Sequence, residues 1–270
     1  MTGPGLAAPW SDVILPDFFY FHGYGPIDST NVEAKRLAAA GAPEGTLVVA
    51  TNQSAGRGRQ GRSWESPTGN LYVSLVLRPG GPAARAAQLS FVTALGLADA
   101  VAGLLEGADI SVKWPNDVLV GGRKICGILL ESGPATDDRR WIVAGAGLNV
   151  ASHPHIAGRA TTSLAAEGAP GASVGDALTA YAECFLDWLN VWERQGFAPV
   201  RAAWKDRAHG LGEPLEVRLP REILRGRFAD LDGDGALVID LGAGQMRRVA
   251  GGEVYFVAPA ERPTAAGTGD

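Results

Sequence analysis

The segment Gly56–Arg62 alternates glycine with arginine, and this alternation restricts what the chain can form at that point. Glycine weakens helices and strands because it loses more backbone freedom on ordering than other residues do. We therefore expect a loop. Glycines let backbone N–H groups approach a ligand closely, and the three guanidinium groups suit phosphate or carboxylate. A flexible basic surface loop, or a contact for nucleic acid, would show the same local pattern.

Two further motifs follow this loop: Lys113–Val118 reads Lys-Trp-Pro-Asn-Asp-Val, and Gly122–Leu129 reads Gly-Arg-Lys-Ile-Cys-Gly-Ile-Leu. Ser29–Asn31 precedes the loop, and Gly145–Val150 follows both motifs. The order and spacing of these segments resembles the catalytic domain of the biotin protein ligases. Each motif alone has little specificity, but the combination is specific. The resemblance extends from about Ser29 to Val257.

The composition limits the class of ligand and the location. The chain has 270 residues, 46% of them hydrophobic, which is enough for one large domain and a small one. The formal net charge of −5 argues against nucleic-acid binding by the whole protein, so the basic loop favours a small anionic ligand. Cys126 and Cys184 are too few for a disulfide framework. We see no secretory signal and no apolar stretch long enough to cross a bilayer, and we expect a cytoplasmic protein.

Hydrophobic periodicity predicts an α+β fold, with a mixed, largely antiparallel sheet and packed helices. Gly121 and Gly122 predict a tight hairpin, which favours antiparallel strands over a doubly wound sheet. Thr30 and Glu33 fit a capping box at the start of the first helix. The predicted helices are Thr30–Ala40, Ala83–Leu105, Val174–Trp192 and Phe197–Ala208. The predicted strands of the sheet are Thr46–Thr51, Leu71–Leu77, Ile110–Trp114, Asp117–Val120, Lys124–Glu131 and Trp141–Val150.

The pattern changes after Gly210, where short strands at close spacing predict a small β barrel. These strands are Leu215–Val217, Ile223–Asp230, Ala236–Asp240, Gln245–Val249 and Val254–Val257. We therefore divide the chain into a catalytic domain over residues 12–209, a small C-terminal β-barrel domain over 210–257 and a disordered tail over 258–270. The resemblance implies a small barrel at the same place.

The side chains of these motifs suit the activation of a carboxylic acid. A carboxylate must be activated before it can join an amine in water, and the usual route is attack on the α-phosphate of ATP to give an acyl adenylate. Both reactants are anions, so the protein must screen their repulsion and hold them in line. Arg57, Arg59, Arg62 and Lys124 can supply fixed positive charge. A solvated hairpin position would also explain Lys124.

The resemblance assigns roles to particular residues. It implies that Lys124, Arg59 and Asp117 act in catalysis. The residues that it implies for biotin binding are Ser29, Thr30, Asn31, Gln53, Arg57, Gly58, Arg59 and Lys124. Those that it implies for ATP or the adenylate are Arg59, Arg62, Trp64, Lys113, Asn116 and Asn149. Hydroxyl and amide side chains suit the ureido ring of biotin because they can both donate and accept hydrogen bonds.

Structural roles would also explain some of these residues. Ser29 and Thr30 fit helix-capping positions, Trp64 fits a buried core position, and Asn116 with Asp117 fits a turn. Mg²⁺ is expected from ATP chemistry, although the sequence identifies no ligands for a metal.

The resemblance implies that the acceptor is a lysine on the biotin carboxyl carrier domain of a carboxylase, of the acetyl-CoA carboxylase type. We expect no DNA binding, because the residues before Ser29 are too few for a helix-turn-helix domain. The sequence leaves a homodimer open.

Three other functions stay open at this point. The first is lipoate or octanoate attachment through a thioester on Cys126, whereas the leading interpretation needs no covalent enzyme intermediate. The second is a biotin-responsive repressor that acts with a separate DNA-binding partner. The third is a protein that binds biotin and nucleotide without catalysis.

Overall fold

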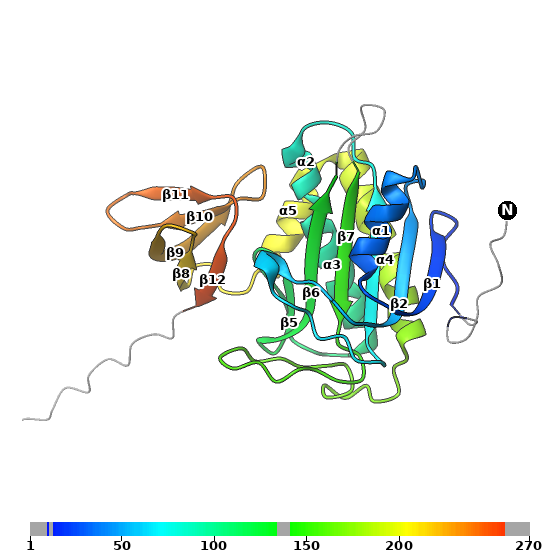
Figure 1. Cartoon of the computed structure of the whole chain (residues 1–270). Coiled ribbons are helices and arrows are strands. Elements are labelled where there is room, and N and C mark those ends of the chain that lie inside the picture. Colours follow the sequence, from blue (N-terminus) through cyan, green and yellow to red (C-terminus); the bar gives the residue numbers. More distant parts are fainter. Residues whose placement is uncertain (1–9, 11–12, 134–140, 257–270) are drawn as a thin grey trace, which may run out of the picture. The chain divides into compact units, whose positions relative to one another are not determined.

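The computed structural model describes Trp10, residues 13–133 and residues 141–256 (Figure 1). The chain divides into two compact units. The first ends at His209 and also holds Gly233–Gly235, and the second begins at Gly210 and resumes at Ala236. Residue 12, Val257 and the tail predicted over 258–270 lie outside the described residues.

A seven-stranded sheet forms the centre of the first unit. Its strands, in spatial order, are β1 (Tyr20–Ile27), β2 (Thr46–Gln53), β3 (Leu71–Leu77), β7 (Ile142–Leu148), β6 (Arg123–Ser132), β5 (Asp117–Val120) and β4 (Ile110–Lys113). All neighbouring pairs are antiparallel except β1 and β2, which are parallel. Gly121 and Gly122 both have positive φ and join β5 to β6 in the predicted hairpin. The predicted mixed, largely antiparallel sheet is confirmed.

Helices cover both faces of this sheet (Figure 1). The helix α1 (Thr30–Ala39) lies on one face, and α3 (Leu89–Leu104) and α4 (Val174–Gln195) lie on the other. The short α2 (Ala83–Ala87) precedes α3, and α5 (Phe197–Asp206) follows α4. The helices packed on a largely antiparallel sheet confirm the predicted α+β class, and their presence on both faces is a feature that the sequence pattern did not predict.

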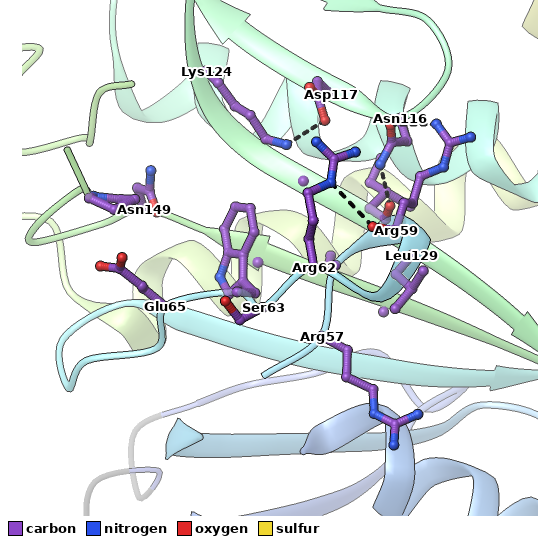
Figure 2. A pocket seen from close by; sticks show the side chains of 18 of the residues that line it. Arg57, Arg59, Arg62, Ser63, Glu65, Asn116, Asp117, Lys124, Leu129 and Asn149 are labelled. Atoms are coloured by element: carbon purple, nitrogen blue, oxygen red, sulfur yellow. Dashed lines mark hydrogen bonds and ion pairs between the residues drawn. The ribbon is translucent and has the colours of Figure 1, made fainter. Parts of the chain in front are cut away.

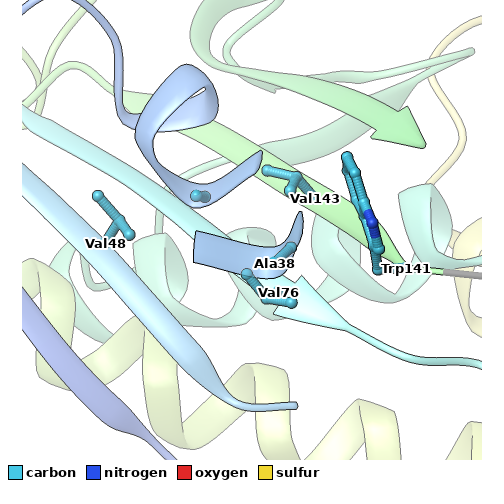
Figure 3. Close-up of a cluster of buried hydrophobic side chains, with 6 residues drawn as sticks. Ala38, Val48, Val76, Trp141 and Val143 are labelled. Atoms are coloured by element: carbon cyan, nitrogen blue, oxygen red, sulfur yellow. The ribbon is translucent and has the colours of Figure 1, made fainter. Parts of the chain in front are cut away.

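The core beneath α1 shows why the helix can lie close to the strands. Ala38 of α1 packs over Val48 of β2, Val76 of β3 and Val143 of β7, with Trp141 beside them (Figure 3). All five residues are at most 4% exposed. The small alanine on the helix and the β-branched valines on the sheet fill the layer without a large side chain between them.

The predicted capping box at Thr30 and Glu33 is wrong. Ser29 is the N-cap residue, and its side chain makes no capping hydrogen bond. The hydroxyl of Thr30 lies 3.2 Å from Oε1 of Gln53 and 2.8 Å from Oγ of Ser74, while Glu33 accepts hydrogen bonds from a tyrosine and an arginine. Both side chains therefore form their hydrogen bonds with groups other than those of a capping box.

Two other elements differ from expectation. The edge strand β1 was not predicted, because Gly23, Gly25 and Pro26 weaken the strand signal and most of its residues are half-buried or exposed. Parallel pairing with β2 nevertheless orders it. The helix predicted over Ala83–Leu105 is divided at Gln88 into α2 and α3.

One helical segment, Ala84–Leu104, is long and apolar enough to cross a membrane by length and composition, contrary to the expectation that no apolar stretch is long enough. In the fold, however, 61% of its most apolar window is buried. The helix packs against both the sheet and α4 and is therefore part of the core.

The second unit is a five-stranded antiparallel sheet, which confirms a small β domain here. Its strands are β8 (Pro214–Arg218), β9 (Ile223–Leu231), β10 (Leu237–Asp240), β11 (Met246–Val249) and β12 (Glu253–Phe256), in the spatial order β11-β10-β9-β8-β12. Val217, Phe228 and Ile239 form part of its core and are at most 1% exposed. Alternation of such residues with polar ones is typical of strands with one buried face.

Gly96 and Gly103 provide a matched test of packing around α3. A Cβ at Gly96 would lie 2.8 Å from the Cα of Phe185 on α4, whereas a Cβ at Gly103 would meet no heavy atom within 4 Å. We expect Gly96→Ala to lower the free energy of unfolding by about 1–3 kcal/mol through overpacking. Gly103→Ala should raise it by about 0.5–1 kcal/mol through helix propensity. Urea unfolding followed by circular dichroism measures both, and equal effects would contradict this account of the α3–α4 contact.

Candidate functional site

A pocket of about 680 Å³ opens on the α1 face of the sheet. The ten residues of α1 span only about 15 Å, so the helix leaves part of this face uncovered. On the uncovered part, Gly147 of β7 pairs with Gly127 of β6, and beneath the first residues of α1 Gly145 of β7 pairs with Ser74 of β3. Directly opposed residues point to the same face. Small side chains therefore leave room for a ligand beside the N-terminal end of α1.

The pocket brings together nearly all of the predicted site residues. The predicted residues that line it are Ser29, Thr30, Asn31, Gln53, Arg57, Gly58, Arg59, Arg62, Trp64, Asn116, Asp117, Lys124 and Asn149. They come from α1, β2, the loop Gly56–Arg62, which we call the arginine loop, the start of β5, β6 and the end of β7. Segments that are far apart in the sequence thus converge on one cavity.

Lys113 on β4 is the predicted residue that does not line the pocket. Burial lowers the pKa of its ammonium group, Asp117 opposes this shift, and the charges of Arg159 and Lys124 add to it. Lys113 therefore lies in the electrostatic surroundings of the site, and its contact with an adenylate stays a prediction.

The arginine loop is an ordered hairpin between β2 and β3. Arg57 and Ser63 pair as an isolated bridge, and the backbone N–H of Gly58 donates to the carbonyl of Arg62 at 2.7 Å. Gln60, with φ of 58°, lies in the left-handed region at the tip. A Cβ at Gly56 would lie 2.4 Å from the carbonyl oxygen of Trp64, so this glycine allows the two arms of the hairpin to approach.

Two of the predicted cations are held by side chains at the start of β5 (Figure 2). Lys124 donates from Nζ to Oδ1 of Asp117 at 2.6 Å, and Arg59 donates from Nη1 to Oδ1 of Asn116 at 3.2 Å. The amide of Asn116 in turn donates to the carbonyl of Ile128 at 2.6 Å. Burial lowers the pKa of the Arg59 guanidinium, against the charge of Asp117. An arginine nevertheless stays protonated, so the pocket holds fixed positive charge.

Trp64 lies on a surface made by two glycines. A Cβ at Gly147 would lie 2.6 Å from Nε1 of the indole, and one at Gly127 would lie 2.7 Å from its Cζ3. The ammonium group of Lys124 lies 5.2 Å from the ring centroid, within range of a cation–π interaction. Among the described residues, the indole N–H of Trp64 is one of two buried side-chain polar atoms without a hydrogen-bond partner. A ligand that accepts this N–H would satisfy it.

The segment after β7 lines the pocket beside Lys124 and carried no recognisable motif. It includes His155, Ile156 and Arg159, and Thr161 forms a parallel bridge with Lys124. Because the segment is rich in glycine, alanine and proline, its sequence indicated only a loop. Asn149, which the sequence did single out, is 3% exposed and donates from its amide to the carbonyl of Thr162 at 2.9 Å.

Cys126 is fully buried in β6. Burial raises the pKa of its thiol well above the usual range, and the nearby charge of Lys124 only partly opposes this effect. A buried thiol with a raised pKa is a poor nucleophile, because the thiolate is the reactive form.

Family models match both units of the chain. Residues 25–149 match the biotin/lipoate A/B protein ligase family, and residues 210–257 match the biotin protein ligase C terminal domain. The first match contains the arginine loop and Lys124, and the second coincides with the five-stranded sheet.

Individual relatives agree with these models. The chain is 42% identical over 236 residues to a biotin–[acetyl-CoA-carboxylase] ligase of Paracoccus denitrificans, covering 85% of this chain and 97% of that protein. It is 34% identical over 226 residues to the bifunctional ligase/repressor BirA of Bacillus subtilis (strain 168), covering 81% of this chain and 68% of that protein. Among solved structures, it is similar to the biotin protein ligase from Aquifex aeolicus in complex with biotin and ATP, with a TM-score of 0.71, 26% identity and coverage of 88% and 98%.

Gly147 provides a test of how Trp64 fixes the arginine loop. We expect Gly147→Ala to displace the indole and increase the rate of trypsin cleavage after Arg57 or Arg62 several-fold, because exposed loops are cleaved when they loosen. Mass spectrometry of the fragments measures this rate. Gly25→Ala, on β1 with open space around its Cβ, is the matched control and should leave the rate unchanged. Equal cleavage in the two variants would show that Trp64 does not fix the loop.

Proposed function

The chain belongs to the biotin protein ligase family, and we propose that it activates biotin with ATP as biotinyl-5′-AMP and transfers it to a lysine of a biotin carboxyl carrier domain. The acceptor is of the acetyl-CoA carboxylase type, as the name of the Paracoccus relative indicates. The observation that carries the proposal is one pocket that joins the cations Arg57, Arg59, Arg62 and Lys124 to the polar side chains at the start of α1.

The first half-reaction joins two anions. A carboxylate oxygen of biotin attacks the α-phosphorus of ATP, the bond to the bridging oxygen breaks, and pyrophosphate leaves. Lys124 and Arg59 reduce the repulsion between carboxylate and phosphate, and their hydrogen bonds to Asp117 and Asn116 hold them in position beforehand. Positioning and fixed charge therefore supply the catalysis, and no enzyme side chain becomes acylated.

The polar end of the pocket suits the ureido ring of biotin. Ser29 and Thr30 are at most 4% exposed and line the pocket beside Gln53. Oε1 of Gln53 accepts from the backbone N–H of Thr30 at 2.8 Å, and its Nε2 donates to Oγ of Ser66 at 2.9 Å. This pair of hydrogen bonds fixes the orientation of the Gln53 amide. The positions of its hydrogen-bond donor and acceptor relative to the ring are therefore fixed as well.

In the second half-reaction, the amine of the acceptor lysine attacks the acyl carbon. A C–N bond forms, the bond from the acyl carbon to the phosphate oxygen breaks, and AMP leaves while the amine loses a proton. We assign the positioning of this amine to Asp117, whose carboxylate lines the pocket and already binds Lys124. We also propose that the first unit carries this chemistry, as the catalytic domain over residues 12–209.

We propose that Mg²⁺ enters with the ATP phosphates. Within residues 13–133 and 141–256, no three His, Cys, Asp or Glu side chains gather into a metal site. Mg²⁺ ordinarily keeps several waters and binds through one or two protein oxygens together with substrate phosphates. Glu65 and Asn149, which line the same part of the pocket in Figure 2, fit this limited role. Bound there, the ion would neutralise charge on the phosphates.

We place the activity in the cytoplasm. Cys126 and Cys184 are both free thiols, as is usual in a reducing compartment. The net charge of −5 also supports a protein acceptor rather than DNA, since a DNA-binding surface would need an excess of positive charge.

Cys126 separates this proposal from acyl transfer through a thioester. We expect Cys126→Ala to keep the rate of biotin transfer to a carrier domain within about twofold of wild type, because the buried thiol takes no part in adenylate chemistry. Streptavidin blotting of the acceptor over time measures the rate. Loss of transfer in a variant that melts at the wild-type temperature would favour the thioester route.

Exchange of labelled pyrophosphate into ATP tests adenylate formation directly. We expect exchange that requires biotin and does not occur with octanoate. Lys124→Ala should reduce it by about 10²–10³-fold, the usual loss when a group that stabilises transition-state charge is removed. Lys205→Ala on α5, outside the pocket lining, is the matched control and should exchange at the wild-type rate. Exchange with octanoate, or none with biotin, would contradict the proposed function.

A further inference from the structure

A row of hydrogen-bonded polar side chains, formed by Thr30, Ser74, Asn31 and Glu131, supports the wall of the pocket. Ser74 on β3 is 0% exposed and does not line the cavity, but its Oγ lies 2.6 Å from Oδ1 of Asn31 and 2.8 Å from Oγ1 of Thr30. Asn31 and Thr30 do line the cavity. Gly145 makes this packing possible, because a Cβ there would lie 1.9 Å from Oδ1 of Asn31.

Glu131, near the end of β6, terminates this row and is not a lining residue. Its Oε2 accepts from Nδ2 of Asn31 at 2.9 Å, and its Oε1 accepts from Nζ of Lys35 at 2.8 Å. Arg57 lies at 3.9 Å from the same Oε1. Figure 2 shows the Arg57 side chain directed away from Lys124 and Asp117.

The charge of Glu131 decides the direction of each hydrogen bond in the row. Burial raises the pKa of this carboxyl, but hydrogen bonds from Lys35 and Asn31 and the charges of Lys35 and Arg57 outweigh burial, and its pKa is lowered. An ionised carboxylate can only accept hydrogen bonds. Asn31 must therefore turn its N–H₂ toward Glu131, where the carbonyl of Leu129 also accepts at 3.4 Å, and its oxygen toward Ser74.

The remaining directions follow from the proton count. Ser74 has one hydroxyl proton, and Oδ1 of Asn31 can only accept, so Ser74 donates to Asn31. The contact of 2.8 Å between the hydroxyl oxygens of Thr30 and Ser74 then requires the proton of Thr30, which is donated inward to Ser74. The hydroxyl oxygen of Thr30 is thereby left as an acceptor for the cavity.

We propose that Glu131 is a positioning residue that fixes the hydrogen-bond polarity of the biotin pocket from outside it, so that Thr30 accepts an N–H group of the ligand. The proposal rests on biotin as the substrate, whose ureido ring offers two N–H donors. With an uncharged residue at position 131, only the long hydrogen bond to the Leu129 carbonyl, at 3.4 Å, holds the Asn31 amide in this orientation, and the amide can turn over. Ser74 would then donate to Thr30, whose own proton would be free to face the ligand N–H.

Glu131→Gln and Lys35→Gln form a matched pair of variants. Together they separate the effect of hydrogen-bond direction at Asn31 from the effect of losing the Lys35–Glu131 ion pair. Both variants remove the Lys35–Glu131 ion pair, but only Glu131→Gln replaces the carboxylate, which can only accept, by an amide that can donate or accept, so that Asn31 is no longer forced to donate. We expect Glu131→Gln to raise the KM and Kd for biotin at least about tenfold, as expected for a mismatched buried hydrogen bond. Its KM for ATP and its kcat should change little. Lys35→Gln should change the KM for biotin less than about twofold, because partly exposed ion pairs contribute little.

The measurements are biotin-dependent pyrophosphate exchange and calorimetric titration with biotin, each with the melting temperature of the variant. Equal changes in the KM for biotin in the two variants, or no change in either, would overturn the inference. If the wild-type protein shows no biotin-dependent exchange, the proposed function fails instead. The two failures are therefore distinguishable.

Ser74→Ala provides an independent test. The hydroxyl of Ser74 hydrogen-bonds to both Asn31 and Thr30 and so links their orientations. Its loss should therefore raise the KM for biotin by a factor similar to that of Glu131→Gln. The double variant should be no worse than the more affected single variant, since both changes interrupt one row. Multiplicative effects in the double variant would contradict a shared pathway.

Discussion

The pocket depends on three sheet positions that carry no side chain. Gly127, Gly145 and Gly147 lie on the face of the sheet that carries α1, and any Cβ there would meet Trp64, Lys124 or Asn31. The glycines thus admit the indole that packs beside the arginine loop and the amide that supports the polar wall. A sheet face with ordinary side chains would have neither the cavity nor the close approach of these groups.

The same face also explains how the positive charge is held in place. Lys124 binds Asp117, Arg59 binds Asn116, and Arg57 lies within 3.9 Å of Glu131. The acceptors belong to β6 and to the start of β5, and both strands are fixed by pairing within the sheet. Cations held in this way need little reorganisation when anionic substrates arrive, which is the main requirement of adenylate chemistry. The overall negative charge of the protein makes this positive region local.

Local patterns predicted much of the fold because strong signals agreed with the tertiary structure. The hairpin at Gly121 and Gly122 and the antiparallel strands around it formed as expected. Predictions failed where the local sequence signal was weak or where tertiary contacts competed with it. The strand β1 contains glycines and proline and becomes ordered only by pairing with β2. Thr30 fitted a helix cap by spacing, but Gln53 and Ser74 provide partners that no local pattern can reveal.

The sequence by itself determined the chemistry of the site, because the types of side chain set which charges and hydrogen bonds are available. Arginines, Lys124 and the hydroxyl and amide groups at the start of α1 indicated a ligand with both anionic and polar parts. Only the tertiary structure decided which groups meet. It brought Glu131 to Asn31 across 100 positions of sequence and placed the unmarked segment around His155 against the pocket, while Lys113 stayed outside the lining. Spacing along the chain carries no information on such contacts, since strand order and register, which depend on packing of the whole sheet, bring them together.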